Sequence, residues 1–236
     1  MPPPPRATPR IQPVSLGYFC GTPYSCIAAD TPTPHAGIVN SVHYFSAQPT
    51  APSAPRTITF ELPDGKWTLT TDTGVFSYGE LDPGTRILLE KAPAPHIPGP
   101  ILDLGCGAGP IAAVWARREP NRELIAVDVN ERALELCRTN TREHPNVTAL
   151  RPEAVDPGIK FAAIYSNPPI KVGKAVLHSM LEEWLVRLLP DGSAYLVVSK
   201  HLGADSLSQW LAEKNFDVNR IASRKGYRII QAKLTS

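Results

Sequence analysis

No run of apolar residues in this 236-residue sequence approaches the roughly 20 that a membrane-spanning helix needs. The first ten residues, MPPPPRATPR, carry charge but are not followed by the apolar stretch of a secretory signal. Cysteine is scarce as well: the four cysteines form no Cys-x-x-Cys pair and no Cys/His cluster with metal-ligand spacing. These absences predict a cytoplasmic protein with no metal and no membrane partner, in which Cys106 and Cys137 are free thiols. For Cys20 and Cys26, a local disulfide is the alternative.

An excess of charge of either sign is also missing. The 24 Lys and Arg residues against 22 Asp and Glu residues leave a formal net charge of only +2. A surface that binds nucleic acid would therefore have to be a local patch and not a field over the whole molecule. Hydrophobic residues make up 42% of the chain, which is enough for a globular core.

Proline is concentrated at one end, since twelve of the 26 prolines lie in residues 1–55. Proline fixes φ and removes a backbone donor, so this stretch cannot form regular hydrogen-bond ladders. We interpret residues 1–50 as a Pro-rich, disordered leader and residues 56–236 as the folded domain. One hypothesis is that the biological start lies near Val39 or Val42, because valine codons can serve as bacterial starts.

The folded part begins with two alternating, β-branched segments, RTITFEL and KWTLTT. Pro63, Asp64 and Gly65 separate them, which predicts a β-hairpin. Further on, Asp82 is placed to cap a short helix that runs to about Lys91, with proline at its first position.

Beyond residue 100, short apolar strands alternate with helices. One of these helices is expected over residues 174–189, closed by Pro190-Asp191-Gly192. Because strands of this kind pack as a parallel sheet covered on both faces, we predict a doubly wound α/β fold. The last two strands are separated by so few residues that they must pair antiparallel.

The segment DLGCGAG, residues 103–109, follows a predicted strand and opens a helix. Its glycines allow a tight turn and a close approach to a ligand at the end of the first strand. The third glycine comes one residue too early for a dinucleotide fingerprint. Asp103 would repel a pyrophosphate but suits the ammonium of a methionine group, or it is a strand-end acid satisfied by backbone donors. The predicted cofactor residues here are Asp103, Gly105, Cys106, Gly107 and Gly109, and the cofactor is S-adenosylmethionine (SAM).

Asp128 lies at the end of the next predicted strand, about 20 residues after the glycine loop. A carboxylate at this position can accept hydrogen bonds from both ribose hydroxyls of an adenosine. The alternative is that Asp128 only caps the helix that begins near Asn130. We include Asp128 and its neighbour Val129 in the predicted cofactor site.

Asn167, Pro168 and Pro169 end the fourth predicted strand of the sheet. The Asn167 side chain and the Pro168 carbonyl could accept the two N–H groups of a conjugated amine and aim its lone pair at a methyl group. Two successive prolines would stiffen the loop. The alternative is a plain turn, which such dipeptides often make. We predict that these three residues form the catalytic loop of an N-methyltransferase.

With these motifs in place, residues from about Thr57 to Leu234 resemble the small methyltransferase (MTS) domain of ribosomal RNA guanine-N2 methyltransferases of the RsmC/RlmG type. The resemblance rests on GVFSYGELDPGTRILLE, DLGCGAGPIA, AVDVNERAL, SNPPI and VVSKHLGADSL. It implies a class I, Rossmann-like SAM methyltransferase fold and methylation of a guanine N2 in ribosomal RNA. It also implies that Phe76, Ser77 and Thr85 lie against the cofactor, although Phe76 could be a core aromatic and Thr85 a helix-cap hydroxyl.

The sequence departs from this family at Ile170, where an aromatic residue usually stacks on the flipped base. The target ring therefore stays open, and a protein glutamine amide or a small-molecule amine is an alternative acceptor. A non-catalytic RNA-binding module with the same fold is an alternative of another class. We also predict that Ile170, Lys171 and Lys200 contact substrate, and that Lys171 and Lys200, together with Lys174 and His201, form an RNA-binding patch on the cofactor rim. The alternative for this patch is an ordinary solvated rim.

Overall fold

The structure is a computed structural model that describes residues 51–235. The leader predicted for residues 1–50, and the start proposed near Val39 or Val42, lie outside the described residues. Strands β1 (Arg56–Leu62) and β2 (Gly65–Thr71) form the predicted hairpin, and Phe60 faces Trp67 across it. No helix among the described residues is long and apolar enough to cross a membrane.

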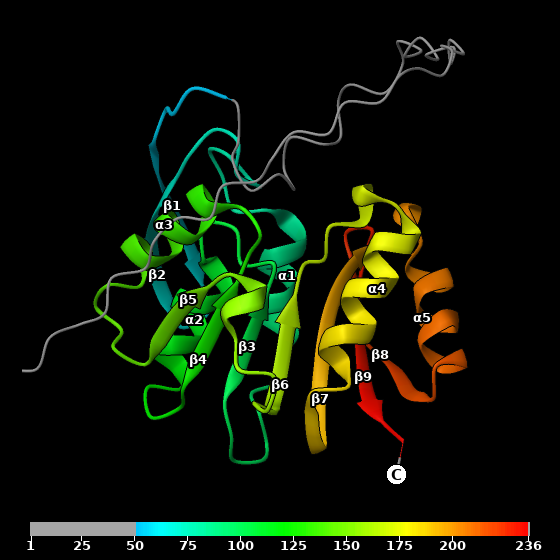
Figure 1. The fold of residues 1–236 in the computed structure, drawn as a ribbon. Coiled ribbons are helices and arrows are strands. Elements are labelled where there is room, and N and C mark those ends of the chain that lie inside the picture. Colours follow the sequence, from blue (N-terminus) through cyan, green and yellow to red (C-terminus); the bar gives the residue numbers. More distant parts are fainter. Residues whose placement is uncertain (1–50, 236) are drawn as a thin grey trace, which may run out of the picture. The chain divides into compact units, whose positions relative to one another are not determined.

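A seven-stranded sheet forms the centre of the domain, in the order β5-β4-β3-β6-β7-β9-β8, which runs from left to right in Figure 1. Only β9 runs antiparallel to its neighbours, β7 and β8, so the predicted mostly parallel sheet with a terminal antiparallel hairpin is confirmed. Lys225 and Gly226 join the last two strands, both with positive φ, as a two-residue hairpin turn requires. The strands are β3 (Ile101–Leu104), β4 (Leu124–Val127), β5 (Val147–Leu150), β6 (Phe161–Ser166), β7 (Leu188–Ser199), β8 (Phe216–Arg224) and β9 (Tyr227–Leu234).

Helices cover both faces of this sheet and create two apolar cores. Helices α1 (Pro83–Lys91), α2 (Pro110–Arg118) and α3 (Glu131–Asn140) pack on one face together with the hairpin. Helices α4 (Lys174–Leu185) and α5 (Ala204–Glu213) pack on the other.

Aromatic rings fill the core beneath the first group of helices. Trp115 of α2 stacks on Tyr165 of β6 with ring centroids 4.4 Å apart, and Tyr165 stacks on Tyr195 of β7 at 5.3 Å. The Tyr165 hydroxyl donates to the Pro93 carbonyl at 2.7 Å, so its polar end is satisfied. This column fixes β6 beneath the segment that follows α1.

The predicted end of the helix over residues 174–189 is wrong. Helix α4 ends at Leu185, and Pro190-Asp191-Gly192 lies inside β7 and not at a helix end. The Arg187 carbonyl accepts from the Phe161 amide at 2.8 Å, and its guanidinium donates to the Ile159 carbonyl at 3.1 Å. Sheet pairing and the burial of Arg187 therefore overrule the helical periodicity at this point.

Candidate functional site

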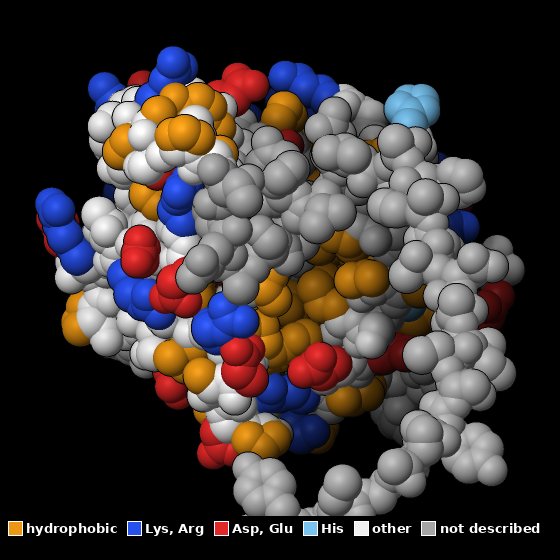
Figure 2. Space-filling view, turned by 45° about the horizontal axis from the view of Figure 1, so that its top comes forward, with side chains coloured by type: hydrophobic (Ala, Val, Ile, Leu, Met, Phe, Trp, Pro, Cys, Tyr) orange, Lys and Arg blue, Asp and Glu red, His pale blue; other side chains and the backbone are white. Residues whose placement is uncertain are grey.

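A pocket opens where β3 and β6 end, beneath the β1–β2 hairpin and the segment that leads into α1. Parallel strands that end at one edge of an open α/β sheet form a ligand-binding crevice there. The described part of this side of the molecule, in Figure 2, shows apolar side chains gathered beside charged side chains of both signs. Seven of the residues predicted from the sequence line the pocket together: Phe76, Ser77, Thr85, Gly105, Cys106, Gly107 and Asn167.

The glycines of the loop after β3 divide into two kinds. Gly105 has φ +76, and a Cβ built on it would meet no atom within 4 Å, so it leaves open space at the pocket. Gly109 has φ +81, but its Cβ would lie 2.7 Å from the Cys137 sulfur in α3. Gly109, predicted as a cofactor residue, is outside the pocket lining and serves the close packing of α3 against the loop.

Cys106 lines the pocket with a buried side chain. The neighbouring Cys137 thiol and the burial of the group raise the pKa of the Cys106 thiol well above its usual range. A thiol in this state is a small apolar group and not a nucleophile.

Asp103 is completely buried below the same loop. One carboxylate oxygen accepts from the Ala112 amide at 2.9 Å, whereas Oδ1 has no hydrogen-bond partner among the described residues. The pKa of Asp103 is raised to about 8. Burial is the largest cause; the hydrogen bond from the Ala112 amide lowers the pKa, and the nearby Asp128 charge raises it. A buried acceptor without a partner is costly unless a donor or cation reaches it.

Asp128 follows β4 and points back to the glycine loop. Its two carboxylate oxygens accept from the Gly107 amide and from the Asn130 amide, both at 2.9 Å. These bonds fix the carboxylate and leave lone pairs for further donors. Asn130, not Asp128, is the N-cap of α3. Val129 is 38% exposed and lies outside the pocket lining.

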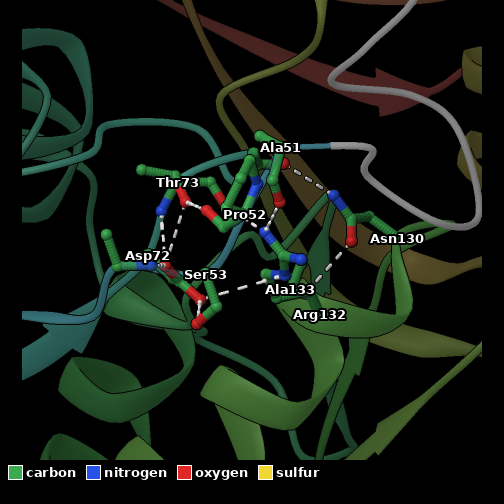
Figure 3. A network of polar contacts seen from close by, with 10 residues as sticks. Ala51, Pro52, Ser53, Asp72, Thr73, Asn130, Arg132 and Ala133 are labelled. Atoms are coloured by element: carbon green, nitrogen blue, oxygen red, sulfur yellow. Dashed lines mark hydrogen bonds and ion pairs between the residues drawn. The ribbon is translucent and has the colours of Figure 1, made fainter.

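A polar network fastens the segment after β2 to α3 (Figure 3). Asp72 accepts from the Thr73 amide at 2.7 Å, and Arg132 of α3 donates to the Thr73 carbonyl at 2.8 Å. Asn130 donates to the Gly74 carbonyl at 2.9 Å, so the residues before Phe76 are anchored beside Asp128. The segment before β1 joins this network through Ala51, Pro52 and Ser53.

The Asn167 side chain bridges the end of β6 and the first turn of α1. Its Nδ2 donates to Asp82 Oδ1 at 2.7 Å and to Thr85 Oγ1 at 3.0 Å. The amide oxygen of Asn167 has no hydrogen-bond partner among the described residues. The loop therefore brings a free carbonyl acceptor to the pocket.

The predicted catalytic loop, which ends at Pro169, runs into a 3₁₀ turn, Ile170–Val172. The Pro168 carbonyl accepts from the Ile170 amide at 2.8 Å, which leaves one of its two lone pairs for another donor. Ile170 is partly buried and packs against the apolar core on the α4 side of the sheet. Pro169 precedes this turn as its cap residue.

The sequence predicted only a capping role for Asp82, and it did not single out Gly84 and Tyr227, which pack beside Asp82. The cap is confirmed, since Asp82 Oδ1 accepts from the Thr85 amide at 2.9 Å. A Cβ on Gly84 would lie 2.9 Å from Asp82 Oδ1 and 2.9 Å from Tyr227 Cε1, so glycine is needed for both to fit. The spacing of Asp82 and Thr85 in LDPGT could have indicated that these two side chains act together, because residues three apart in a first helical turn lie on one side.

The basic residues predicted to contact substrate follow the ends of β6 and β7, which are adjacent and parallel. Lys171, Lys174, Lys200 and His201 are all exposed, and none of the four forms an ion pair among residues 51–235. In contrast, Arg224 pairs with Glu90 and Arg228 with Asp205. Within the same range, no group of His, Cys, Asp or Glu is arranged to hold a metal ion.

Comparison with known proteins identifies the domain. The model of the family "Methyltransferase small domain" matches residues 66–231. An uncharacterized Bacillus subtilis (strain 168) protein, YbxB, is 38% identical over 82% of this chain and 98% of its own length. The ribosomal RNA small subunit methyltransferase C of Shewanella piezotolerans (strain WP3 / JCM 13877) is 33% identical over 72% of this chain and 50% of its own.

Among solved structures, the 16S rRNA N2 methyltransferase RsmC of T. thermophilus, in complex with AdoMet and guanosine, matches with a TM-score of 0.64. It is 25% identical, and the match covers 79% of this chain and 52% of that protein. The chain thus spans about half the length of the methyltransferase C relatives it matches.

The two kinds of glycine predict different stabilities for alanine variants. Gly105→Ala meets open space and should cost only the left-handed backbone strain, about 1–2 kcal/mol. Gly109→Ala adds the clash with Cys137 and should cost about 1–3 kcal/mol more. Urea unfolding of the two variants checks the order, and equal losses would show that Gly109 is not a packing residue.

Asp103 predicts a pH dependence of stability with a definite sign. Its pKa rises from an ordinary 3.8 to about 8 on folding, so between these values the folded protein binds more protons than the unfolded chain. Stability should therefore fall as the pH rises through this window. Asp103→Asn, which cannot ionise, should lose less unfolding free energy than the wild type between pH 5 and 8. Urea titrations decide this, with exposed Asp217→Asn as control; parallel curves for Asp103→Asn and wild type would contradict it.

Proposed function

The chain belongs to the methyltransferase small domain family, and we propose that it transfers the methyl group of SAM to the N2 amino group of a guanine in ribosomal RNA. The observation that carries the proposal is the free carbonyl oxygen of Asn167 in the same pocket as the glycine loop. The relatives named as rRNA methyltransferases and the similar RsmC structure support the choice of acceptor.

The residues around the glycine loop fit SAM. The buried Oδ1 of Asp103 lacks a partner, which an ammonium could supply directly or through water. The space above Gly105 is open, and Asp128 is held by two amides with lone pairs left for ribose hydroxyls. When bound, SAM supplies a methyl group already activated on a sulfonium. Phe76, Cys106 and Gly107 complete the proposed cofactor site, Val129 flanks it, and Gly109 supports it by packing.

The loop at the end of β6 then has one task, which is to hold the acceptor amine in line. The Asn167 oxygen and the second lone pair of the Pro168 carbonyl accept its two N–H bonds. An exocyclic amine held in this way has its lone pair aimed away from both acceptors. No strong base is needed beforehand, because the extra proton leaves after transfer, and positioning alone supplies a large share of the rate.

The acceptor base would be held without the aromatic ring that usually follows the two prolines. Ile170 packs partly into the core and offers only apolar contact. Phe76 lines the pocket and is 53% exposed. Among the described residues that line the pocket, it is the aromatic one, and its ring has a free surface. The unpaired Lys171, Lys174 and Lys200, with His201 beside them, would contact phosphates of the surrounding RNA. Such a substrate places the enzyme in the cytoplasm.

Removing the Asn167 acceptor should abolish function without emptying the cofactor site. We expect Asn167→Ala to lower methyl transfer by about 100-fold or more and to change SAM affinity by less than about tenfold. Nucleoside mass spectrometry of ribosomal RNA, from cells lacking the protein and rescued with wild type or variant, measures the first effect, and calorimetry measures the second.

The same comparison tests the acceptor. N2-methylguanine that depends on the wild-type protein supports the proposal. Methyl groups that appear only on protein glutamine or on a small amine would replace it, and failure to bind SAM would indicate a non-catalytic module.

The unpaired rim lysines predict a change in the salt dependence of RNA binding. For Lys171→Ala and Lys200→Ala, we expect the slope of log affinity against log salt to fall by about 1 for each phosphate that the variant no longer binds. Lys66→Ala is the control, because Lys66 lies beside the hairpin turn that Arg118 ties to the far end of α2. Fluorescence anisotropy with ribosomal RNA fragments at several salt concentrations gives the slopes; unchanged slopes would make the rim an ordinary solvated surface.

A further inference from the structure

We propose that Asp82 and Thr85 are positioning residues that fix the orientation of the Asn167 side chain, so that its oxygen and not its nitrogen faces the acceptor amine. This inference rests on the proposed function and adds residues to its site. It gives Thr85, which resemblance had placed against the cofactor, a different role. It also gives Asp82 a second role beside its helix cap.

The two ends of an asparagine amide have the same shape but opposite hydrogen-bonding character. Turned by 180°, Asn167 would offer N–H groups to an amine that itself presents N–H groups, and no acceptor would hold the substrate. Orientation is therefore as important as position at this residue.

The partners of Asn167 distinguish the two orientations. The Asp82 side chain offers no N–H group, and its Oδ1 accepts from the Asn167 Nδ2 at 2.7 Å. In the turned state the Asn167 oxygen would instead face a carboxylate at this distance. Thr85 Oγ1 takes the second N–H at 3.0 Å, so both amide protons are used on the α1 side.

The start of α1 is a rigid support for these two acceptors. Asp82 Oδ1 also accepts from the Thr85 amide, which locks the two side chains into one helical turn. Thr85 is 3% exposed, so its hydroxyl has little choice of partner. Gly84 leaves the room that the Asp82 carboxylate needs, with Tyr227 closing the other side. A residue that acts only as a helix cap would need no contact with a strand end 85 residues away.

An exchange of the two side-chain types tests the pair. Asn167→Asp keeps an acceptor oxygen but places a second carboxylate against Asp82, and we expect methyl transfer to fall by about 100-fold or more. Adding Asp82→Asn should recover at least about tenfold of this loss, because a neutral amide replaces one of the two facing carboxylates and removes their charge repulsion. Asparagine caps helices as well as aspartate does. A double variant no more active than Asn167→Asp would therefore overturn the proposal.

Thr85 offers a matched pair of variants. Thr85→Val keeps the side-chain shape and removes the acceptor, and we expect kcat to fall by about tenfold while KM for SAM changes less than about threefold. Thr85→Ser keeps the hydroxyl and should stay near wild-type kcat. A rise in KM for SAM at unchanged kcat would return Thr85 to the cofactor site and overturn its positioning role.

A measurement without substrate separates this inference from the choice of acceptor. In ¹⁵N-asparagine-labelled protein, the side-chain signals of Asn167 are those that disappear in Asn167→Asp. Their amide protons should exchange more slowly than those of exposed Asn121 in the wild type, and faster in Thr85→Val than in Thr85→Ser. Equal exchange in the two variants would overturn the proposal. Wild-type protein that methylates another amine would overturn only the guanine assignment, since the exchange rates still decide the role of Asp82 and Thr85.

Discussion

The common direction of β3, β4 and β6 is the constraint on which the rest of the site depends. Parallel strands finish at one edge, so the glycine loop, Asp128 and Asn167 meet there although they come from three separate segments of the chain. The antiparallel hairpin β8–β9 adds Tyr227 at the same edge, because β9 starts where β7 ends. One sheet edge thus receives both the proposed cofactor-binding residues and the proposed acceptor-binding residues.

The polar groups around the pocket differ in how completely their hydrogen-bonding capacity is used. Asp72, Asn130 and Arg132 make a complete network that anchors the segment before Phe76. Asp103 lies beneath the glycine loop with one oxygen unpaired, which destabilises the free protein. A ligand that brings a cation to this oxygen would supply the missing partner and remove the destabilisation of the folded state. This gain in free energy would then contribute to cofactor affinity.

The family relationship and the local departures from it bear on different parts of this site. Fold and cofactor chemistry belong to the features that the chain shares with the small methyltransferase domains. Under the proposed function, contact with the target base would depend on Ile170 and contact with RNA phosphates on the rim lysines, whereas the chain spans about half the length of the methyltransferase C relatives. Selection among RNA sites would then come from the rim or from residues outside the described domain.

The fold class, the hairpin, the cap at Asp82 and the two loops that line the pocket with the glycines and Asn167 could all be predicted from the sequence, because local periodicity, turn residues and short motifs report backbone geometry directly. The same reasoning misjudged the end of α4, where the buried Arg187 and sheet pairing prevail over the helical pattern. The packing of the folded chain was needed to separate Gly109, which packs on Cys137, from Gly105, which faces the pocket. Packing also joined Asn167 to Asp82 and Thr85, since a contact across 85 residues depends on how α1 lies over the sheet and leaves no local trace in the sequence.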